Sequence, residues 1–269
     1  MQFGLIHYRT PGDTLEQFLD FAANTGFNAV ELMISDIWPI EEPSPERRAE
    51  WARSQLDRCA LNISALGAGN DFVFLDEQAI QVQVNRLRRV SKLAALIGCK
   101  VLRTEGGQRK EQVPQEREEY AITEHLKRCA DIAESDDILL AVDNHGVVTN
   151  DVDLLVRILR EVGSPRVGAN MDTGNFRWAG CSVEDCRRCY EKIAPFAQHL
   201  HLKDCIGSGP NYRGTILGQG EIDIHHAIKA LQHVDYQGVY CAEWEGPADE
   251  DGAVAYTHCL QWMKSNINI

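Results

Sequence analysis

Residues 138–146 read Ile-Leu-Leu-Ala-Val-Asp-Asn-His-Gly, five consecutive apolar residues followed by three polar ones and a glycine. Successive side chains of a strand point to opposite faces, so a run that is apolar at every position predicts a strand buried on both faces. Residues 115–135 before it and 152–161 after it carry apolar residues at helical spacing. A buried strand between two helices predicts parallel strands joined by right-handed crossovers, and hence an α/β fold.

The same alternation runs along the whole chain. The segments that we expect to be strands are residues 3–7, 29–32, 63–66, 101–104, 138–142, 167–171, 199–202 and 239–242. Helical patterns separate them at residues 14–24, 45–60, 78–97, 115–135, 152–161, 183–193, 222–232 and 249–262. Eight such units predict a (β/α)8 TIM barrel rather than a doubly wound open sheet, because no glycine-rich turn follows the first strand. No Ser-rich or Pro-rich linker interrupts the pattern, so we expect a single domain over residues 1–269.

The composition argues against several classes of partner. The chain carries 27 Lys+Arg and 40 Asp+Glu, a formal net charge of −13. Because phosphate backbones are held by basic patches, nucleic acid is not an expected partner. No apolar run approaches the ~20 residues of a membrane span, and the N-terminus does not resemble a secretory leader. We therefore expect a soluble, cytoplasmic protein without a membrane partner, with a homo-oligomer possible, whose nine cysteines are mostly reduced core residues.

In a barrel of this kind the catalytic residues project from the C-terminal ends of the strands. The polar residues at the eight ends are His7, Glu31, Asn70 with Asp71, Glu105, Asp143 with Asn144 and His145, Asp172, His201 with Lys203 and Asp204, and Glu243 with Glu245. So many carboxylates would repel one another unless a cation lay among them. The last four strands offer three carboxylates and one imidazole, from Asp143, Asp172, His201 and Glu243. This set predicts one divalent metal ion, with Mn²⁺ or Mg²⁺ favoured and Zn²⁺, Co²⁺ or Fe²⁺ as alternatives.

Motifs in the second half of the chain carry a resemblance to a known family. They are D-N-H at residues 143–145, M-D-T-G-N at 171–175, H-L-K-D at 201–204, L-G-Q-G-E-I-D at 217–223 and A-E-W-E-G at 242–246. In this order they resemble the xylose isomerase-like superfamily of sugar isomerases and epimerases, which also contains AP endonuclease family 2, inosose dehydratases and hydroxypyruvate isomerases. The resemblance implies that Asp143, Asp172, His201 and Glu243 are the metal ligands. It also implies that Asp143 and Glu243 form an acid/base pair that moves a proton at the carbon next to a carbonyl.

Two positions depart from the family pattern. Asp143 stands where relatives usually carry glutamate, which shortens the reach of the carboxylate by about 1.5 Å. Asn175 stands where relatives often carry a histidine that contacts the sugar. Both departures affect which reaction we expect the protein to catalyse more than they affect the expectation of a bound metal.

The expected chemistry follows from the metal. A divalent ion that bridges a carbonyl and a neighbouring hydroxyl stabilises the enediolate formed when the proton between them is removed. We expect Glu243 to be the base, Asp143 or Glu105 to lie opposite it, and Lys203 to balance the oxyanion. The side chains expected to contact substrate are His7, Glu31, Glu105, His145, Asn175 and Arg213. Glu31 has the alternative role of pairing with Arg9 or Arg103, and we expect only one of His199 and His201 to face the site.

The leading hypothesis is a metal-dependent isomerase or epimerase of carbohydrate metabolism, acting on a sugar or keto-sugar that is not phosphorylated. The alternative is a lyase or dehydratase, in which the same metal and base remove a proton and a β-substituent leaves, as with an inosose or a 3-keto-glycoside. An AP endonuclease would need more histidines and a basic face, and the charge of −13 argues against it. The non-enzymatic hypothesis is a barrel that binds a sugar without catalysing a reaction.

Overall fold

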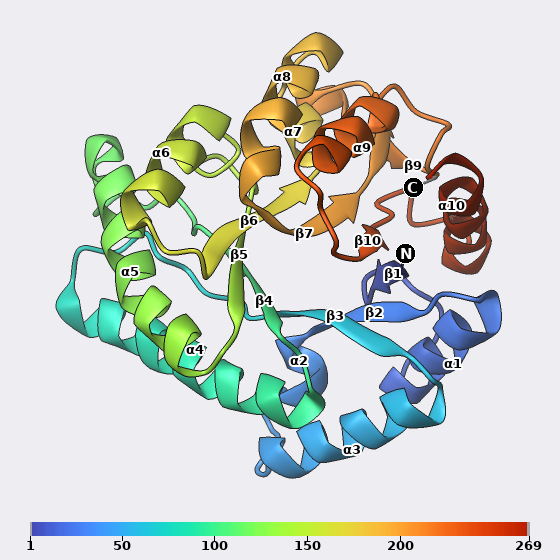
Figure 1. Cartoon of the computed structure of the whole chain (residues 1–269), viewed down its shortest axis with the longest axis horizontal. Helices are drawn as coiled ribbons and strands as arrows, with labels where there is room; N and C mark the ends of the chain where they lie inside the picture. The colour runs from blue at the N-terminus through green and yellow to red at the C-terminus, as the bar shows by residue number, and fades with distance from the viewer. Residues whose placement is uncertain (1, 268–269) are drawn as a thin grey trace.

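Eight parallel strands close into a barrel in the computed structural model, which describes residues 2–267 (Figure 1). The order around the barrel is β1, β10, β7, β6, β5, β4, β3 and β2, and every neighbouring pair is parallel. Their bounds are β1 Phe3–Ile6, β2 Ala29–Met33, β3 Asn62–Gly67, β4 Val101–Glu105, β5 Leu139–Asp143, β6 Val167–Asp172, β7 Ala197–Leu202 and β10 Tyr240–Ala242. The predicted α/β barrel is confirmed, with each strand found within two residues of its expected bounds.

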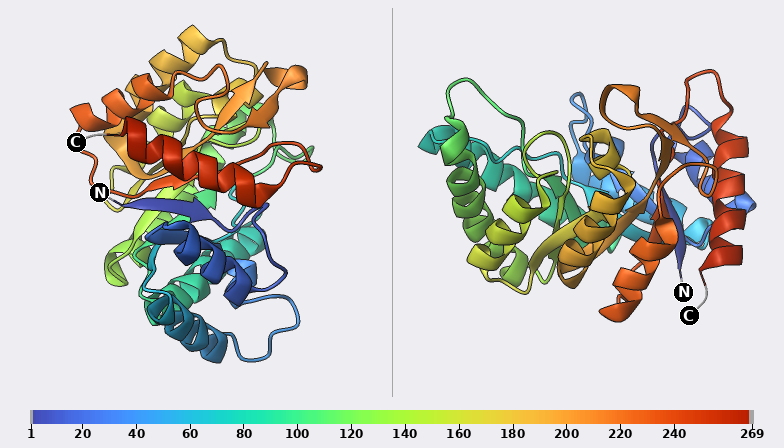
Figure 2. Two further views of the ribbon diagram at one scale, coloured as in Figure 1. Left: turned by 90° about the vertical axis from the view of Figure 1, so that its right-hand side faces the viewer. Right: turned by 90° about the horizontal axis from the view of Figure 1, so that it is seen from above.

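Helices surround the strands (Figures 1 and 2). The long ones are α1 Leu15–Thr25, α3 Pro45–Arg58, α4 Glu77–Ile97, α5 Gln115–Ser135, α6 Val152–Val162, α8 Val183–Ile193, α9 Ile224–His233 and α10 Gly252–Asn266. The prediction missed the short elements, which are α2 Ile34–Ile37, α7 Asn175–Trp178, the 3-10 turns Ala194–Phe196 and Gly209–Asn211, and a hairpin of β8 Asp204–Ile206 with β9 Arg213–Thr215. Four residues or fewer are too short to show a periodic apolar pattern. Apart from the turn Ala194–Phe196, which lies between α8 and β7, these short elements lie after strands, where a barrel builds its site.

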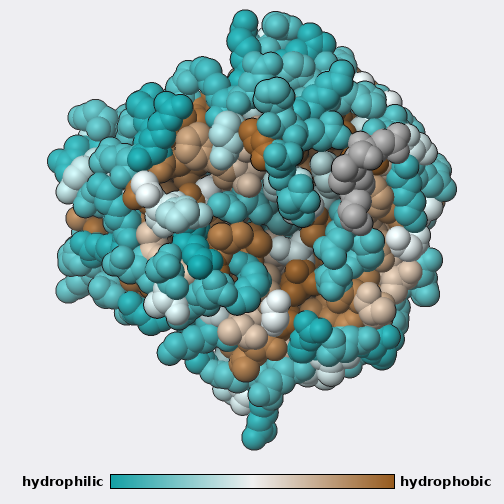
Figure 3. All heavy atoms as spheres, viewed as in Figure 1, coloured by the Kyte–Doolittle hydropathy of each residue, from teal (hydrophilic) through white to brown (hydrophobic). Residues whose placement is uncertain are grey.

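The strands are covered on their outer face by the apolar sides of the helices. In β5 and β6 nearly every side chain is buried, as the continuous apolar runs predicted. On the face shown in Figure 3, hydrophilic side chains predominate around the rim and apolar surface shows mainly toward the middle. No helix within residues 2–267 is both long and apolar enough to cross a membrane.

Candidate metal centre and adjoining cavity

The barrel register brings the polar strand ends of the second half together. Asp172 at the end of β6 pairs with His201 on β7, and Cys241 on β10 pairs with His201 from the other side. Glu243 is two residues beyond Cys241, and its N–H donates to the carbonyl of Leu202 (3.0 Å). Three strands separated in sequence by up to 70 residues therefore present their polar ends at one point.

Asp172, His201 and Glu243 form a group with the spacing of metal ligands. Each offers one atom, and these atoms all lie within 4.8 Å of one another. His201 Nδ1 lies 2.7 Å from Glu243 Oε2 and 3.5 Å from Asp172 Oδ2. Asp172 Oδ1 accepts the backbone N–H groups of Gly174 and Asn175, whereas Oδ2 is buried and makes no hydrogen bond. Oδ2 instead faces the Lys203 ammonium (3.1 Å) and the His201 ring, and a buried carboxylate oxygen beside an imidazole and a second carboxylate fits a divalent cation.

Asp143, the fourth ligand in the predicted set, is not brought into this group. Its Oδ2 accepts from Arg103 Nη1 (3.1 Å) and its Oδ1 accepts from Asn170 Nδ2 (2.9 Å). The carboxylate is 2% exposed, and burial raises the pKa of Asp143 although the positive charge of Arg103 opposes that shift. Both oxygens of Asp143 are therefore already in use.

Glu31 is paired with Arg103, one of the two roles expected for it. The Arg103 Nε donates to Glu31 Oε1, and Glu31 Oε2 lies 2.6 Å from His201 Nε2. Burial alone would raise the pKa of Glu31, but Arg103 and His201 outweigh it and hold that pKa well below its usual range. Because Glu31 takes the Nε2 side of the ring, it aims Nδ1 at Asp172 and Glu243, as partners behind metal-binding histidines do.

The expectation that only one of His199 and His201 faces the site was wrong. The two rings are perpendicular, with centroids 5.3 Å apart, and both lie near Glu31. The physical reason is that residues i and i+2 of a strand share a face. His199 Nδ1 pairs with Asn170 Oδ1 (2.8 Å), so His199 supports the amide that holds Asp143.

Lys203 is the second cationic side chain of the site, after Arg103, and its ammonium group lies beside Asp172 and Glu243. Its Nζ lies 3.1 Å from Asp172 Oδ2, 3.2 Å from Glu243 Oε1 and 3.1 Å from Glu245 Oε1. Burial alone would lower the pKa of Lys203, but these carboxylates outweigh it and raise that pKa. The network holds the carboxylates of Glu31, Asp143, Asp172, Glu243 and Glu245 against the permanent charges of Arg103 and Lys203. The excess of negative charge favours a further cation.

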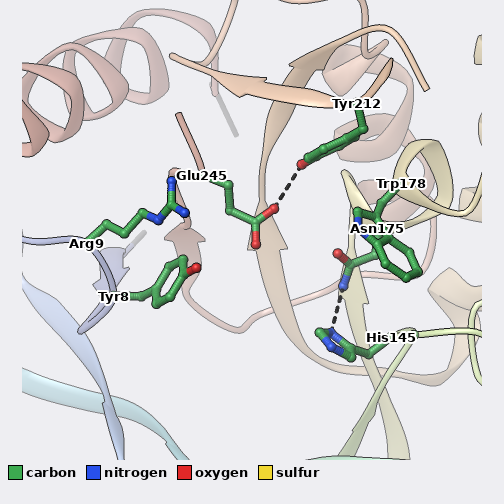
Figure 4. A pocket seen from close by; sticks show the side chains of 8 residues that line it. Tyr8, Arg9, His145, Asn175, Trp178, Tyr212 and Glu245 are labelled. Carbon is green, nitrogen blue, oxygen red and sulfur yellow. Dashed lines mark hydrogen bonds between the residues drawn. The ribbon is translucent and has the colours of Figure 1, made fainter. Parts of the chain in front are cut away.

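A cavity of about 320 Å³, here called the first cavity, opens beside this network (Figure 4). It is lined by Tyr8, Arg9, His145, Gly146, Asn175, Trp178, Tyr212 and Glu245. The Tyr212 hydroxyl donates to Glu245 Oε2 (3.0 Å), and the other oxygen of Glu245 contacts Lys203. Glu245 therefore connects the first cavity to the ligand group through Lys203.

Only two of the six predicted substrate contacts line the first cavity. His145 and Asn175 do, and the two side chains approach within 3.5 Å of each other. His7 instead pairs with Asp36 (2.9 Å) and stacks on Phe18. Three other predicted contacts do not line it: Glu31 is fully buried, Arg213 is exposed on β9, and Glu105 ends β4.

Six of the eight lining residues were not among the predicted substrate contacts, and three of the six, Tyr8, Arg9 and Glu245, carried a signal in the sequence. Tyr8 and Arg9 directly follow His7 at the end of β1. Glu245 is two residues after Glu243 and so follows the same strand. Trp178 and Tyr212 come from the short helix α7 and the segment before β9, which the apolar pattern did not show.

The nine cysteines are all free thiols. Cys181, Cys186 and Cys189, whose spacing resembles a metal motif, do not form a group of three ligands within residues 2–267. The thiol of Cys189 hydrogen-bonds Cys181 and lowers the pKa of Cys181 to about 7. A second candidate group, Glu31 with His201 and Cys241, lies in the barrel interior, where Glu31 is already paired with Arg103.

Residues 19–266 match the family model described as xylose isomerase-like TIM barrel. No curated protein matches the sequence significantly. Among solved structures, the chain is similar to the IOLI protein with a bound zinc atom, at 17% identity and a TM-score of 0.82, with 100% of both chains covered.

Two further solved structures share the fold. One is a xylose isomerase domain protein from Alicyclobacillus acidocaldarius, at 17% identity and a TM-score of 0.80, with 99% of this chain and 98% of that chain covered. The other is a D-allulose 3-epimerase from Methylomonas sp. in complex with D-allulose, at 16% identity and a TM-score of 0.79, with 99% and 97% covered. At these identities the likeness concerns the fold.

Proposed function

The chain belongs to the xylose isomerase-like TIM barrel family, and from that premise we propose that it is a divalent-metal-dependent isomerase or epimerase of a sugar or keto-sugar. The observation that carries the proposal is the convergence of Asp172, His201 and Glu243, whose ligand atoms lie within 4.8 Å of one another in the buried interior of the barrel. Relatives of the same fold whose names include a bound zinc atom and a D-allulose complex support a metal and a sugar.

In this proposal Asp172, His201 and Glu243 hold the ion. An ion held by these residues would supply Lewis-acid chemistry, which stabilises negative charge on a substrate oxygen. Two carboxylates with one imidazole suit Mn²⁺ or Mg²⁺, and Zn²⁺, Co²⁺ and Fe²⁺ accept the same donors. Asp143 joins this set only if it leaves Arg103, so its proposed role is to hold Arg103 in place.

The protein's own groups then move the proton. Glu243 removes the proton next to the carbonyl and returns it, since its side chain is 11% exposed and is the most accessible of the group. The Lys203 ammonium stabilises negative charge that develops on a substrate oxygen. Tyr212, whose hydroxyl is held by Glu245, is placed in the first cavity to hydrogen-bond a substrate hydroxyl, as are His145 and Asn175.

The test is metal content per chain, measured by elemental mass spectrometry on the protein and on the His201→Ala variant. We expect about one equivalent of a divalent metal in the protein and its loss in His201→Ala. The exposed His233→Ala is the matched control and should keep the metal. A metal-loaded sample is then screened with ketoses, aldoses and inososes for exchange of substrate protons into D₂O. If no sample contains metal even after it has been soaked with Mn²⁺, the proposal is wrong.

A lyase or dehydratase is the second candidate, and one observation favours it. Epimerisation at one carbon needs groups on both faces of the substrate, whereas both oxygens of Asp143 are held by Arg103 and Asn170. Elimination needs a single base with an acid at the leaving oxygen, and Glu243 with Tyr212 meets that need. Product mass separates the two, because an isomerase conserves mass and a lyase releases water or an aglycone.

We also propose a cytoplasmic location, since nine free thiols suit a reducing compartment.

A further inference from the structure

A second cavity, of about 660 Å³, adjoins the first and shares Gly146 and Trp178 with it. A ligand bound in the first cavity can therefore extend into the second without crossing another element. The first cavity is at the small end of the range for ligand sites, and the second is about twice its size. The pair is larger than a single sugar ring requires.

The two cavities differ in chemistry. The first is lined by ionisable and hydrogen-bonding side chains such as Arg9, His145 and Glu245. The wall of the second is mainly apolar, with side chains from Val147, Trp178, Ala179, Cys181 and Pro210. Trp178 is 45% exposed and Val147 is 54% exposed, so two large apolar side chains face the solvent at the mouth of a polar site. Exposed apolar surface beside a polar cavity marks a place where an apolar group binds.

The polar residues of the second cavity are already engaged. Asn150 donates to the Gly146 carbonyl (2.8 Å) and accepts from Asn144 (3.2 Å). Asp151 caps helix α6 by accepting the Leu154 N–H (3.0 Å). The carboxylate of Asp151 would repel a phosphate, and the engaged amide of Asn150 leaves few hydrogen-bonding groups for a second sugar ring.

Trp178 lines both cavities, and the backbone of the short helix that carries it is held by hydrogen bonds. It ends α7, the short helix that begins at Asn175, and its N–H donates to Gly174 (3.0 Å). The neighbouring Arg177 is buried and clamps the carbonyl of Cys181 (2.8 Å) and the carboxylate of Glu221 (2.7 Å). Figure 4 shows the indole beside Asn175 at the edge of the first cavity. Trp178 is 45% exposed, and its indole offers its apolar face to a flat ring.

We propose that the second cavity is a subsite for an apolar, ring-shaped aglycone, so that the ligand of this site is a keto-glycoside, whose ring ketone supplies the carbonyl that the glycosidic bond removes from the anomeric carbon. The inference rests on the proposed function, since the sugar part occupies the first cavity beside the metal ligands. The aglycone lies across Trp178 toward Val147.

The test compares matched ligands on the Mn²⁺-loaded protein by isothermal titration calorimetry. The probes are the methyl and phenyl β-glycosides of D-glucose, D-galactose and D-xylose. For at least one sugar the phenyl glycoside should bind about tenfold more tightly than the methyl glycoside, because the ring is buried on Trp178. Val147→Asp places a charge in the second cavity and should bring the phenyl-to-methyl ratio close to one. Val254→Asp, at an equally exposed valine of α10, should leave the ratio unchanged.

Equal affinities for the two glycosides, or a ratio that Val147→Asp does not change, would overturn the inference and leave the proposed function standing. A dimer in the native protein that Val147→Asp separates, without a phenyl preference, would assign this face to a second copy of the chain and overturn it too. Binding of neither glycoside also overturns it. In that case the metal content of the same sample decides separately whether the proposed function fails.

Discussion

Arg103 is the residue on which the buried charges of the barrel depend. Its guanidinium contacts both Glu31 and Asp143, and all three side chains are almost fully buried. Arg103→Ala leaves two buried carboxylates unpaired, and we expect the free energy of unfolding to fall by about 3–5 kcal/mol. Arg128→Ala breaks an exposed fork with Glu77 and should cost less than about 1 kcal/mol. Urea unfolding of the two variants checks this, and equal losses would contradict it.

Asp143 and Asp172 differ in their expected contribution to metal binding. Asp172 lies in the group with His201 and Glu243, whereas both oxygens of Asp143 are held by Arg103 and Asn170. Asp172→Asn should weaken the affinity for Mn²⁺ by about 100-fold, since a charged ligand is lost, whereas Asp143→Asn should change it by less than about tenfold. Calorimetric titration of metal-free protein gives both values. An equal loss in the two variants would show that Asp143 is a ligand after all.

Residue by residue, the sequence predicted the part of the site that topology alone brings together. Asp172, His201 and Glu243 follow successive strands of a closed barrel, so their convergence follows from the fold. The pairing of Arg103 with Asp143 depends on how a long side chain packs across the barrel interior, which strand order does not specify. Tyr212 belongs to a segment whose path is set by tertiary contacts, so no local pattern pointed to it.

At the scale of elements, Asp204 ties the segment after β9 to the start of β8. Its carboxylate accepts the N–H groups of Gly218, Gly220 and Ile222, and of Cys205 beside it. Asp204→Ala leaves these donors without an acceptor, so the segment should open more readily by about 2–3 kcal/mol. Hydrogen exchange at Gly218 and Gly220 should then be roughly 100-fold faster.

The control for this experiment is Asp251→Ala, which removes the cap of α10 and should leave exchange at Gly218 and Gly220 as it was. Unchanged exchange in Asp204→Ala would mean that other contacts, such as the packing of Gly218 against Trp262, hold the segment.

Helix α5 carries a buried histidine that makes stability depend on pH. His125 is 1% exposed and stacks on Phe72, and burial lowers the pKa of His125 below its model-peptide value of 6.5. As the pH is lowered through about 6.5, the imidazole of His125 takes up a proton in the unfolded chain before it does so in the folded chain. The free energy of unfolding therefore decreases as the pH decreases. His125→Phe should make that fall shallower between about pH 7 and pH 5.

Urea unfolding of both proteins in metal-free buffer at a series of pH values checks the prediction. Above about pH 7.5 the ring is neutral in both states, so the difference between the two proteins should stay constant there. A slope below about pH 6.5 that is the same in both proteins would show that other groups cause it.

The long elements were predictable from the chain because each has enough residues to show its period. Helices α5 and α8 begin and end where the apolar pattern placed them. The short helices α2 and α7 and the β8–β9 hairpin were not predictable, since four residues or fewer do not complete a pattern. Their position is set by what they pack against, and α7 shows this through the contact of Asn175 with Asn144 (2.9 Å).

For the molecule as a whole, the net charge of −13 sets which large ligands can approach. Duplex DNA is repelled by a negative surface, and this repulsion is strongest at low salt. We expect no retention and no cleavage of a duplex with an abasic site at about 50 mM salt, with or without Mn²⁺. A gel-shift and nicking assay checks this. Nicking that is lost in His201→Ala would move the function to the endonuclease branch of the family.

Both ends of the described chain lie at the side of the barrel away from the first cavity. The residues that line the first cavity follow the C-terminal ends of the strands. The right-hand view of Figure 2 shows β1 beginning and α10 ending close together at the opposite side. A tether, a surface anchor or a reporter protein joined to either end therefore projects away from incoming ligand. The barrel can be immobilised or joined in tandem with another enzyme while its mouth stays open to small molecules.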